Sequence, residues 1–326
     1  MISAHARVER AFERLAAERF DERATPYLRI GPDDDLDEVR LGKGPSGTYR
    51  LWARLASGEN DTGRSGVGTM LPVELETLAT ENGGTRQFLR VSCEDPRLNR
   101  TFLSLVAEML DDVETAGTPV ADALSKVIDS WRELLRSREK EMDRSEAIGL
   151  FGELVVLQQL VATEGRQALG VWRGAENYRH DFSRVNALEV KTYTGFGEPR
   201  VRIHGVHQLE PPTGHQLHLV ALRIDENASG RTIADLVDEL VVAGVPRGQV
   251  LRKIGKTMDE LERTASCFVI EETRLFEVGP DFPGIRTSTL AESAVRGVDD
   301  LTYSLSLDLC PSPLSQNALQ DVLEAL

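Results

Sequence analysis

The pattern of apolar and polar positions in the middle of the chain predicts a β-hairpin. Residues 187–192 are apolar and β-branched enough to form a strand, and residues 179–183 can form the strand before it. With the turn centred near Val185, Asp181 and Glu189 are equidistant from the turn and face each other, with Cβ atoms roughly 5 Å apart. We therefore expect two carboxylates side by side on one face of the hairpin.

The polar residues of this hairpin indicate a metal site. Lys191 lies two residues beyond Glu189 and projects from the same face, whereas Val190 points into the other layer. Two carboxylates that face each other repel unless a positive group lies between them. A divalent cation with a lysine beside it meets that need, and such a group is typical of metal-dependent phosphodiesterases. The alternative is that these residues are ordinary charges on a solvated strand face.

Helical periodicity predicts two helices before the hairpin, and the second contains an unusual pair of glycines. This helix covers about residues 145–163 and includes Gly149 and Gly152, although each glycine costs roughly 1 kcal/mol inside a helix. Small residues three positions apart suit a close approach of the helix to a sheet. That approach brings Glu153 to the sheet edge beside the two hairpin carboxylates. The alternative is that Glu153 is a solvated residue on the helix surface.

The first third of the chain has the pattern of a small α+β domain. Gly42 to Gly47 matches a G-x-G-x-x-G string, but the residues after it alternate like a strand, so we interpret it as a hairpin turn rather than a phosphate loop. Residues 56–70 are rich in Gly, Ser, Asn and Asp, which predicts a mobile surface loop. The other elements expected here are helices over 4–20 and 95–113 and strands over 27–30 and 88–93.

The region after the hairpin continues as alternating strands and helices. Residues 200–204 are expected to be the third strand of the sheet, and residues 216–224 another strand. The remaining predictions are helices at 232–242, 249–254 and 258–264, strands at 267–270 and 275–278 joined by a turn, a strand at 303–309 and a closing helix.

A zinc site is the less favoured interpretation of the histidines in this region. His215 and His218 lie on a predicted strand and would point to opposite faces. Cysteines are few and widely spaced, with no CxxC pair, so neither a zinc ribbon nor a disulfide framework is indicated. The four histidines are His204, His207, His215 and His218, and the three cysteines are Cys93, Cys267 and Cys310.

Composition excludes several classes of protein. Apolar residues make up 40% of the chain and charged residues 28%, which rules out wholesale disorder. No stretch approaches 18 apolar residues and the N-terminus has no signal-peptide core, so we expect no transmembrane helix and a reducing, cytoplasmic setting.

The net charge of −15 does not favour nucleic-acid binding, because nucleic-acid binders are usually basic. The distribution of charge matters more than the sum. Between residues 166 and 206, seven basic residues outnumber four acidic ones, and two of those acids are the proposed metal ligands. A local positive excess therefore surrounds the hairpin, although we expect weak DNA affinity without a partner.

Together these segments resemble one nuclease superfamily. An Asp followed by Glu-Val-Lys on a strand resembles the PD-(D/E)XK signature, and the wider chain is similar to a bacterial family of PD-(D/E)XK members often found beside restriction and phage-defence genes. The further segments that carry the resemblance are Gly149 to Leu154, Trp172 to Gly174, His207 to Leu209, Phe282 to Ile285 and Tyr303 to Leu305.

The resemblance implies a mixed α/β fold with a restriction-endonuclease-like core, in which helices flank a mixed sheet. Residues 115–119 contain Gly117 and Pro119 and break the chain, so we place a domain boundary there. The chain then divides into an N-terminal α+β domain for recognition or structure (1–117), the nuclease-like core (118–245) and a C-terminal α+β extension that packs on the core (246–326).

The resemblance also implies a catalytic set and a metal. Asp181, Glu189 and the Val190 carbonyl would bind Mg²⁺ or Mn²⁺, Glu153 would bind it through water or hold a second ion, and Lys191 would orient the attacking water or offset phosphate charge. Further residues expected to line the cleft are Arg173, His180, His207 and Gln208.

The expected function is DNA cleavage by a Mg²⁺-dependent endonuclease in a restriction or phage-defence system. Its expected partners are DNA and other defence proteins such as a methylase, ATPase or helicase, with a homodimer as one option and no membrane. The alternative is a nuclease-like scaffold or recognition subunit that no longer cuts. A transcription or repair factor without catalysis would need a helix-turn-helix or a basic helix, and the sequence pattern contains neither.

Overall fold

The chain forms two compact units, which are described separately below. Unit 1 comprises Met1–Glu139 and Gly255–Asp259, and unit 2 comprises Lys140–Ile254 and Glu260–Leu326. The computed structural model describes residues 4–17, 26–31, 38–44, 47–55, 71–79, 84–136 (without the side chains of 132–136), 142–174, 178–291, 296, 301–315 and 317–326.

Unit 1 is built on a five-stranded antiparallel sheet in the order β1-β2-β3-β5-β4. β2 and β3 pair in antiparallel fashion on either side of the glycine-rich string, and Gly44 N–H donates to the Thr48 carbonyl at 2.7 Å. This pairing confirms the predicted hairpin, while residues 45–46 lie outside the described residues. The expected loop at 56–70 lies outside the described residues. Bounds are α1 Ala4–Ala17, β1 Tyr27–Arg29, β2 Val39–Lys43, β3 Tyr49–Arg54, β4 Val73–Ala79, β5 Thr85–Ser92, α2 Asn99–Ala116 and α3 Val120–Arg136.

The domain boundary predicted after residue 117 falls inside unit 1. Gly117 takes a left-handed conformation (φ 67°) and ends α2, but α3 then folds back to contact α2. The turn therefore joins two helices of one unit, and the chain enters unit 2 at Lys140.

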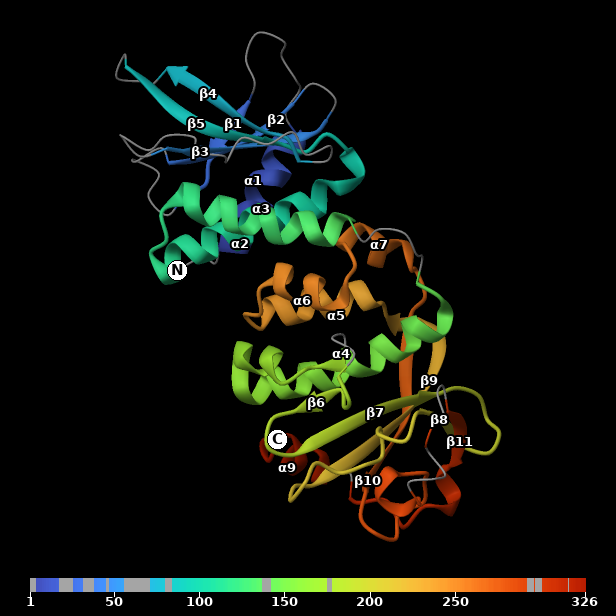
Figure 1. Ribbon diagram of the computed structural model, residues 1–326. Coiled ribbons are helices and arrows are strands. Elements are labelled where there is room, and N and C mark those ends of the chain that lie inside the picture. The colour runs from blue at the N-terminus through green and yellow to red at the C-terminus, as the bar shows by residue number, and fades with distance from the viewer. Residues whose placement is uncertain are drawn as a thin grey trace. The chain divides into compact units, whose positions relative to one another are not determined.

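Unit 2 is built on a four-stranded mixed sheet in the order β10-β9-β7-β6 (Figure 1). The central pair β7 and β9 is parallel, whereas β6 pairs with β7 and β10 pairs with β9 in antiparallel fashion. Bounds are α4 Arg144–Glu164, β6 Phe182–Ser183, β7 Ala187–Tyr193, β8 Arg200–His204, β9 Leu217–Arg231, α5 Ile233–Val242, α6 Arg247–Ile254, α7 Met258–Arg263, β10 Phe268–Glu277, β11 Thr302–Ser306 and α9 Ala318–Glu324. The mixed α/β class predicted from the sequence is confirmed.

Helix α4 covers one face of this sheet. It starts at Asp143, whose carboxylate accepts a bond from the backbone of Glu146 while the Glu146 side chain bonds back, which is a capping box. At Gly152 a Cβ atom would lie 2.5 Å from Thr192 Cγ2, so the helix approaches β7 more closely than an alanine would allow. Around Gly149 nothing lies within 4 Å of that position. Of the two glycines, only Gly152 is therefore needed for the predicted close approach of the helix to the sheet.

The stretch Arg144–Gly170, which contains α4, is long and apolar enough to cross a membrane by length and composition. Ten of the residues in α4 are buried inside unit 2, which is the position of a core helix. This buried position explains why so apolar a helix occurs without the polar face expected of a surface helix.

The opposite face of the sheet packs on a small two-stranded sheet made of β8 and β11. Val201 and Ile203 of β8 share an apolar core with Ala187 and Tyr193 of β7 and Leu305 of β11. The prediction that β8 is the third strand of the main sheet was wrong, because its hydrogen-bond partner is β11, almost one hundred residues later in the chain.

The two strands predicted at 267–270 and 275–278 form one continuous strand, β10. β10 runs without a turn from Phe268 to Glu277 and pairs along its length with β9, with an irregularity between Ile270 and Glu272. The polar residues 271–274 have the composition of a turn, but Thr273 and Arg274 stay in register with Leu222 and Ala221, so the predicted turn was wrong. Because β10 is an integral strand of the core sheet, the predicted extension from residue 246 folds as part of unit 2.

The end of the chain holds the turn between β6 and β7. Val185 N–H donates to the Leu326 carbonyl at 2.8 Å, and Asn186 Nδ2 donates to the Ala325 carbonyl at 2.7 Å. Since Asn186 also accepts a bond from Gln216 N–H at 3.0 Å, the turn is fixed from two sides.

Candidate active site

Asp181 is fixed at the sheet edge where β6 begins. The pairs Phe182–Leu188 and Ser183–Ala187 centre the turn on Val185, which is the register expected from the sequence. The Asp181 carbonyl accepts bonds from the N–H groups of Arg173 (2.6 Å) and Gly174 (3.0 Å). Its side-chain Oδ2 accepts the N–H of Val190 at 2.7 Å. Both the backbone and one carboxylate oxygen of Asp181 are therefore held in place.

Glu153 reaches the same place from α4. Its Oε2 accepts a bond from the indole nitrogen of Trp172 at 2.7 Å, and that tryptophan is fully buried. Glu153 Oε2 and Asp181 Oδ1 both lie less than 3.0 Å from the point that a Cβ of Gly174 would occupy. The two carboxylates thus converge on one small space, which exists because residue 174 has no side chain.

Glu189 and Lys191 project together from β7. Lys191 Nζ lies 2.7 Å from Glu189 Oε1, and the exposed fractions of the two side chains are 14% and 1%. Glu189 Oε2 is buried and has no hydrogen-bond partner among the described residues. Val190, between them, packs the other way, toward Gly152 of α4. Glu189 and Lys191 therefore project from one face of β7 and Val190 from the other, as strand alternation predicts.

The electrostatics of this group are unbalanced, with three carboxylates around one lysine. Burial and the charge of Asp181 raise the pKa of Glu153 to about 8, and the same two causes raise the pKa of Glu189 to about 8. Burial also raises the pKa of Asp181, against the opposing effects of Lys191 and the Val190 N–H bond. The pKa of Lys191 is raised, because the carboxylates outweigh its burial. The site favours additional positive charge.

The donor set fits a hard divalent cation. Carboxylate oxygens are the ligands that Mg²⁺ and Mn²⁺ prefer, and Glu189 offers a buried oxygen without a partner beside the space shared by Glu153 and Asp181. Within the ranges that the structure describes, no three His, Cys, Asp or Glu side chains are grouped closely enough to make a complete metal site. Metal binding would thus require the three carboxylates to move closer together.

The residues expected to line the cleft take different positions. His180 is buried, which lowers its pKa to about 4, so the ring is neutral near pH 7. Arg173 stacks over Tyr178 with its guanidinium carbon 5.3 Å from the ring centre. His207 is exposed, with Nδ1 3.3 Å from Thr287 Oγ1, and Gln208 accepts the N–H of His204 at 2.8 Å.

The side chain of Arg179, just before the β6–β7 hairpin, contacts the segment from His207 to Glu210. Its guanidinium donates to the carbonyls of His207 (3.0 Å) and Glu210 (2.9 Å). The backbone of His207 and Glu210, on either side of Gln208, is thus tied to the residues just before Asp181, which lie outside β6, so the strand predicted at 179–183 is limited to Phe182–Ser183.

Two residues of the site have roles that the sequence did not reveal. Trp172 orients Glu153 and also lies under Lys253, whose ammonium donates to the Trp172 carbonyl at 2.5 Å. Gly174 leaves space for the two carboxylates. Both belong to the Trp-Arg-Gly segment that contributes to the family resemblance, but their contacts depend on the folded arrangement of three separate segments.

Comparison with known proteins places the chain in a family. A family model described as "Putative PD-(D/E)XK family member, (DUF4420)" matches residues 8–308. Neither the comparison with curated proteins nor that with solved structures found a match. The match spans both units and contains every residue of the carboxylate group, in an arrangement where helix and hairpin bring Glu153, Asp181 and Glu189 to one sheet edge. The chain belongs to this PD-(D/E)XK family, whose superfamily suggests nuclease-type activity.

Proposed function

We propose that the protein hydrolyses DNA phosphodiester bonds as a metal-dependent endonuclease. The observation that carries the proposal is the convergence of Glu153 and Asp181 beside Gly174, with Glu189 and Lys191 on the adjacent strand. Three buried carboxylates around one ammonium are costly unless a cation joins them. Such a group, at the edge of a mixed sheet in a PD-(D/E)XK family member, is best explained by catalysis.

The residues of the chain would divide the work as follows. Asp181, Glu189 and the Val190 carbonyl would hold Mg²⁺ or Mn²⁺, with Glu153 as a further ligand directly or through water. When bound, the metal would supply a water of lowered pKa and neutralise phosphate charge. Lys191, a compact ammonium with only 14% of its side chain exposed, would orient that water or offset charge on the phosphate.

Cleavage of a supercoiled plasmid in Mg²⁺, in Mn²⁺ and in EDTA tests this proposal. Asp181→Asn is the informative variant, because its amide oxygen can still accept the Val190 N–H while the negative charge is lost. We expect cleavage by the wild type with either metal and none by the variant. Glu271→Gln serves as the matched control, since Glu271 is an exposed carboxylate on β10 of the same unit.

Calorimetric titration with Mn²⁺ tests the ligand assignment separately. Asp181→Asn and Glu189→Gln should each lose metal affinity, whereas the Glu271→Gln control should keep it. Normal Mn²⁺ binding by Asp181→Asn, or equal cleavage by the wild type in EDTA, would overturn the assignment.

A second candidate is a nuclease-like scaffold that does not cut. One observation favours it: Glu153 bonds Trp172, Asp181 bonds the Val190 N–H, and Glu189 lies against Lys191. Each carboxylate thus has a partner within the chain, and a scaffold could keep these contacts as structure. No Mn²⁺ binding and no cleavage of DNA or RNA by the wild type would favour this candidate.

We further propose a cytoplasmic restriction or phage-defence setting, in which a methylase, ATPase or helicase partner, or a second copy of the chain, could be required. This proposal rests on the family resemblance alone. Its test is phage plating on bacteria that express the wild type or Asp181→Asn. Equal plating on both strains would remove the support for a defence role.

A further inference from the structure

The small β8–β11 sheet has an outer face made of basic and hydroxyl-bearing side chains. Along β8, Arg200, Arg202 and His204 alternate with two buried apolar residues and are exposed. Across the ladder these three residues pair with Ser306, Ser304 and Thr302, respectively. Because paired residues in a sheet project from the same face, guanidinium, imidazole and hydroxyl groups form one continuous surface.

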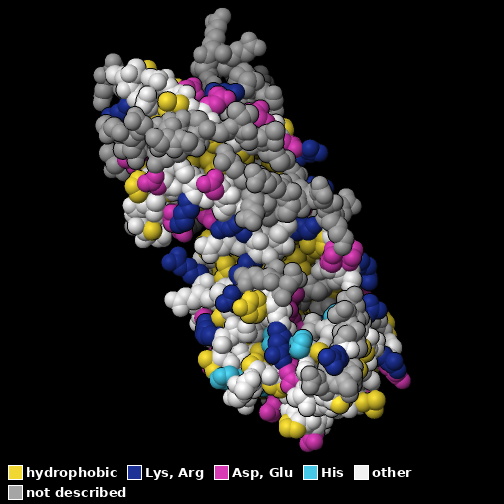
Figure 2. Space-filling view, in the orientation of Figure 1, with side chains coloured by type: hydrophobic (Ala, Val, Ile, Leu, Met, Phe, Trp, Pro, Cys, Tyr) yellow, Lys and Arg dark blue, Asp and Glu magenta, His cyan; other side chains and the backbone are white. Residues whose placement is uncertain are grey.

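This surface is turned away from the protein core. Val201 and Ile203 on the inner face of β8, and Leu305 on the inner face of β11, are buried in the apolar core that this sheet shares with β7. Both strands are described throughout, and none of their outward residues is acidic. In a chain of net charge −15, six outward positions without a carboxylate form a distinct surface. On the face shown in Figure 2, both basic and acidic side chains are exposed.

The surface continues toward the candidate active site. β8 follows β7 in the chain and contacts it, and Tyr193 at the end of β7 packs in the same core as Val201. Lys191 lies two residues before Tyr193 on β7 and projects from the same face of that strand, so the lysine is on the side of β7 that packs against the β8–β11 sheet. At the end of β8, His204 Nδ1 lies 3.3 Å from Thr302 Oγ1 across the ladder.

We propose that the outer face of the β8–β11 sheet binds the phosphate backbone of the DNA substrate and leads it to Lys191. Arginine and hydroxyl side chains are among the groups that contact DNA phosphates, and such contacts position the duplex without reading its sequence. This inference rests on the proposed function for its direction toward the site, but it makes a claim about binding that holds without cleavage.

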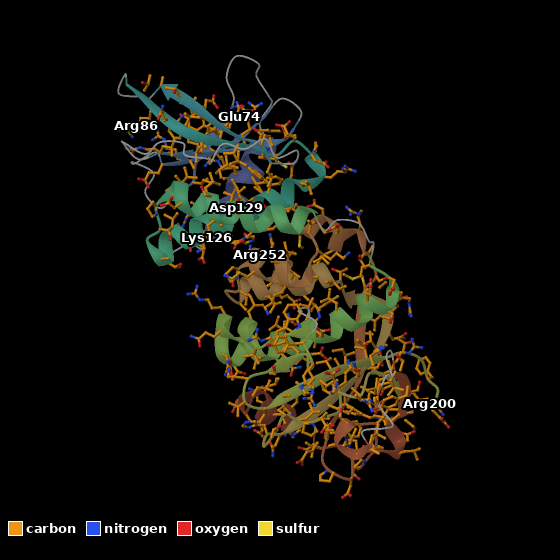
Figure 3. The ribbon with its side chains drawn as sticks, in the orientation of Figure 1. Glu74, Arg86, Lys126, Asp129, Arg200 and Arg252 are labelled. Carbon is orange, nitrogen blue, oxygen red and sulfur yellow. The ribbon has the colours of Figure 1, made fainter. Side chains whose placement is uncertain are left out.

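Among the described residues, the ion pair that this surface forms is compatible with phosphate binding. Arg200 bonds Glu198, but 58% and 71% of these side chains are exposed, so the pair is weak and a phosphate can replace the carboxylate. In Figure 3, Arg200 lies at the outer edge of unit 2.

The test is DNA affinity measured by fluorescence anisotropy in EDTA, where no metal-dependent cleavage occurs. The double variant Arg200→Ser/Arg202→Ser should weaken binding of a labelled duplex by about tenfold or more at moderate salt. The slope of log affinity against log salt concentration should become shallower by roughly two, about one for each lost phosphate contact. Arg202→Lys, in an otherwise wild-type chain, should keep the slope, because its charge is retained.

A matched control is available at α4, on the face of the main four-stranded sheet opposite to the β8–β11 sheet. Arg144→Ser/Arg166→Ser removes the same charge at the two ends of the α4 stretch, and Arg144, like Arg200, belongs to an exposed ion pair, with Glu226. This control should bind DNA nearly as the wild type does. Equal loss in both double variants, an unchanged salt slope in Arg200→Ser/Arg202→Ser, or no DNA binding by the wild type would each overturn the inference. Binding that depends on these arginines, in a protein that never cleaves, would support it while refuting the proposed catalysis.

Discussion

Glu153→Gln should stabilise the metal-free protein at neutral pH while removing its activity. The side chain of Glu153 is held against Asp181, with Lys191 already beside Glu189. Glutamine keeps an oxygen that can accept the Trp172 indole N–H, and it is neutral without having to bind a proton when the chain folds. The variant therefore changes charge with little change of shape.

The magnitude follows from the shift in the Glu153 pKa, which is raised from 4.5 to about 8. Between these values the folded chain keeps a proton that the unfolded chain has released, so wild-type stability falls as pH rises. Each pH unit in this window costs roughly 1.36 kcal/mol for one proton. At pH 7 the wild type should therefore be less stable than the variant by on the order of 3 kcal/mol, and below pH 4.5 this difference in the free energy of unfolding vanishes. Glutamine has no proton to lose, so the variant should lack this slope.

Hydrogen exchange followed by mass spectrometry measures this effect in unit 2 alone. Peptides from β7 and β9 report the opening free energy of the central sheet, and EDTA keeps the protein metal-free. Protection of these peptides in the variant should exceed that of the wild type at pH 7 and approach it at pH 5. Rates must be corrected for the intrinsic pH dependence of exchange.

Two results would refute this reasoning. A gain of equal size at pH 5 and pH 7 would mean that the charge of Glu153 is not its cause. A similar gain in Glu271→Gln would mean that removing any carboxylate from an acidic chain suffices. Added Mg²⁺ should narrow the difference, because the metal stabilises the wild type by mass action and the variant less.

Three further predictions concern single positions. Gly152→Ala should lower the free energy of unfolding by about 1–3 kcal/mol, because its Cβ would meet Thr192. Gly149→Ala on the same helix should raise it by up to about 1 kcal/mol. Thermal denaturation measures both changes, and equal shifts would contradict the close approach of the helix to β7. Gly174→Ala should lower Mn²⁺ affinity in calorimetry by at least about tenfold while the protein stays folded, since a methyl group there displaces two carboxylates; unchanged affinity would exclude the shared space as the metal site. Lys191→Met should leave Mn²⁺ affinity largely intact and slow plasmid cleavage by about a hundredfold or more; loss of metal binding would reassign Lys191 to structure.

The hairpin could be predicted because its pattern determines its register. The alternation around β7 requires Leu188 and Val190 on one side and Glu189 on the other, and a slip of one residue would bury the charges differently. A short turn centred on Val185 then leaves one pairing for Phe182. The local sequence was sufficient because both strands and the turn lie within a dozen residues.

Sheet membership could not be predicted in the same way. The alternation of β8 is identical whether its partner is β7 or β11, and the choice depends on a strand about one hundred residues away. In β10, the polar run from Glu271 to Arg274 has the composition of a turn. The long partner β9 keeps it extended, and Arg274 bonds Glu272 and Asp308. Tertiary pairing outweighed local preference in both cases.

The carboxylates of the candidate site were chosen from the sequence by charge and order, but the groups around them were not. Trp172 lies nineteen residues from Glu153, and no spacing rule relates an indole to a helix carboxylate across that distance. Gly174 acts through an absent side chain, which only the distances in the folded chain reveal. The candidate ligands could be selected from pattern and family resemblance, whereas the groups that orient them depend on packing.

The bonds from Ala325 and Leu326 to the β6–β7 turn have a consequence for truncation. The turn lies between Asp181 and Glu189, and the carbonyl that Asn186 contacts belongs to a residue 139 positions later in the chain. A chain shortened before Ala318 should therefore hold these two carboxylates in a looser hairpin. We expect such a chain to exchange the amides of β7 faster than the 326-residue chain. The placement of the carboxylates is thus coupled to a segment that contributes no side chain to the candidate site.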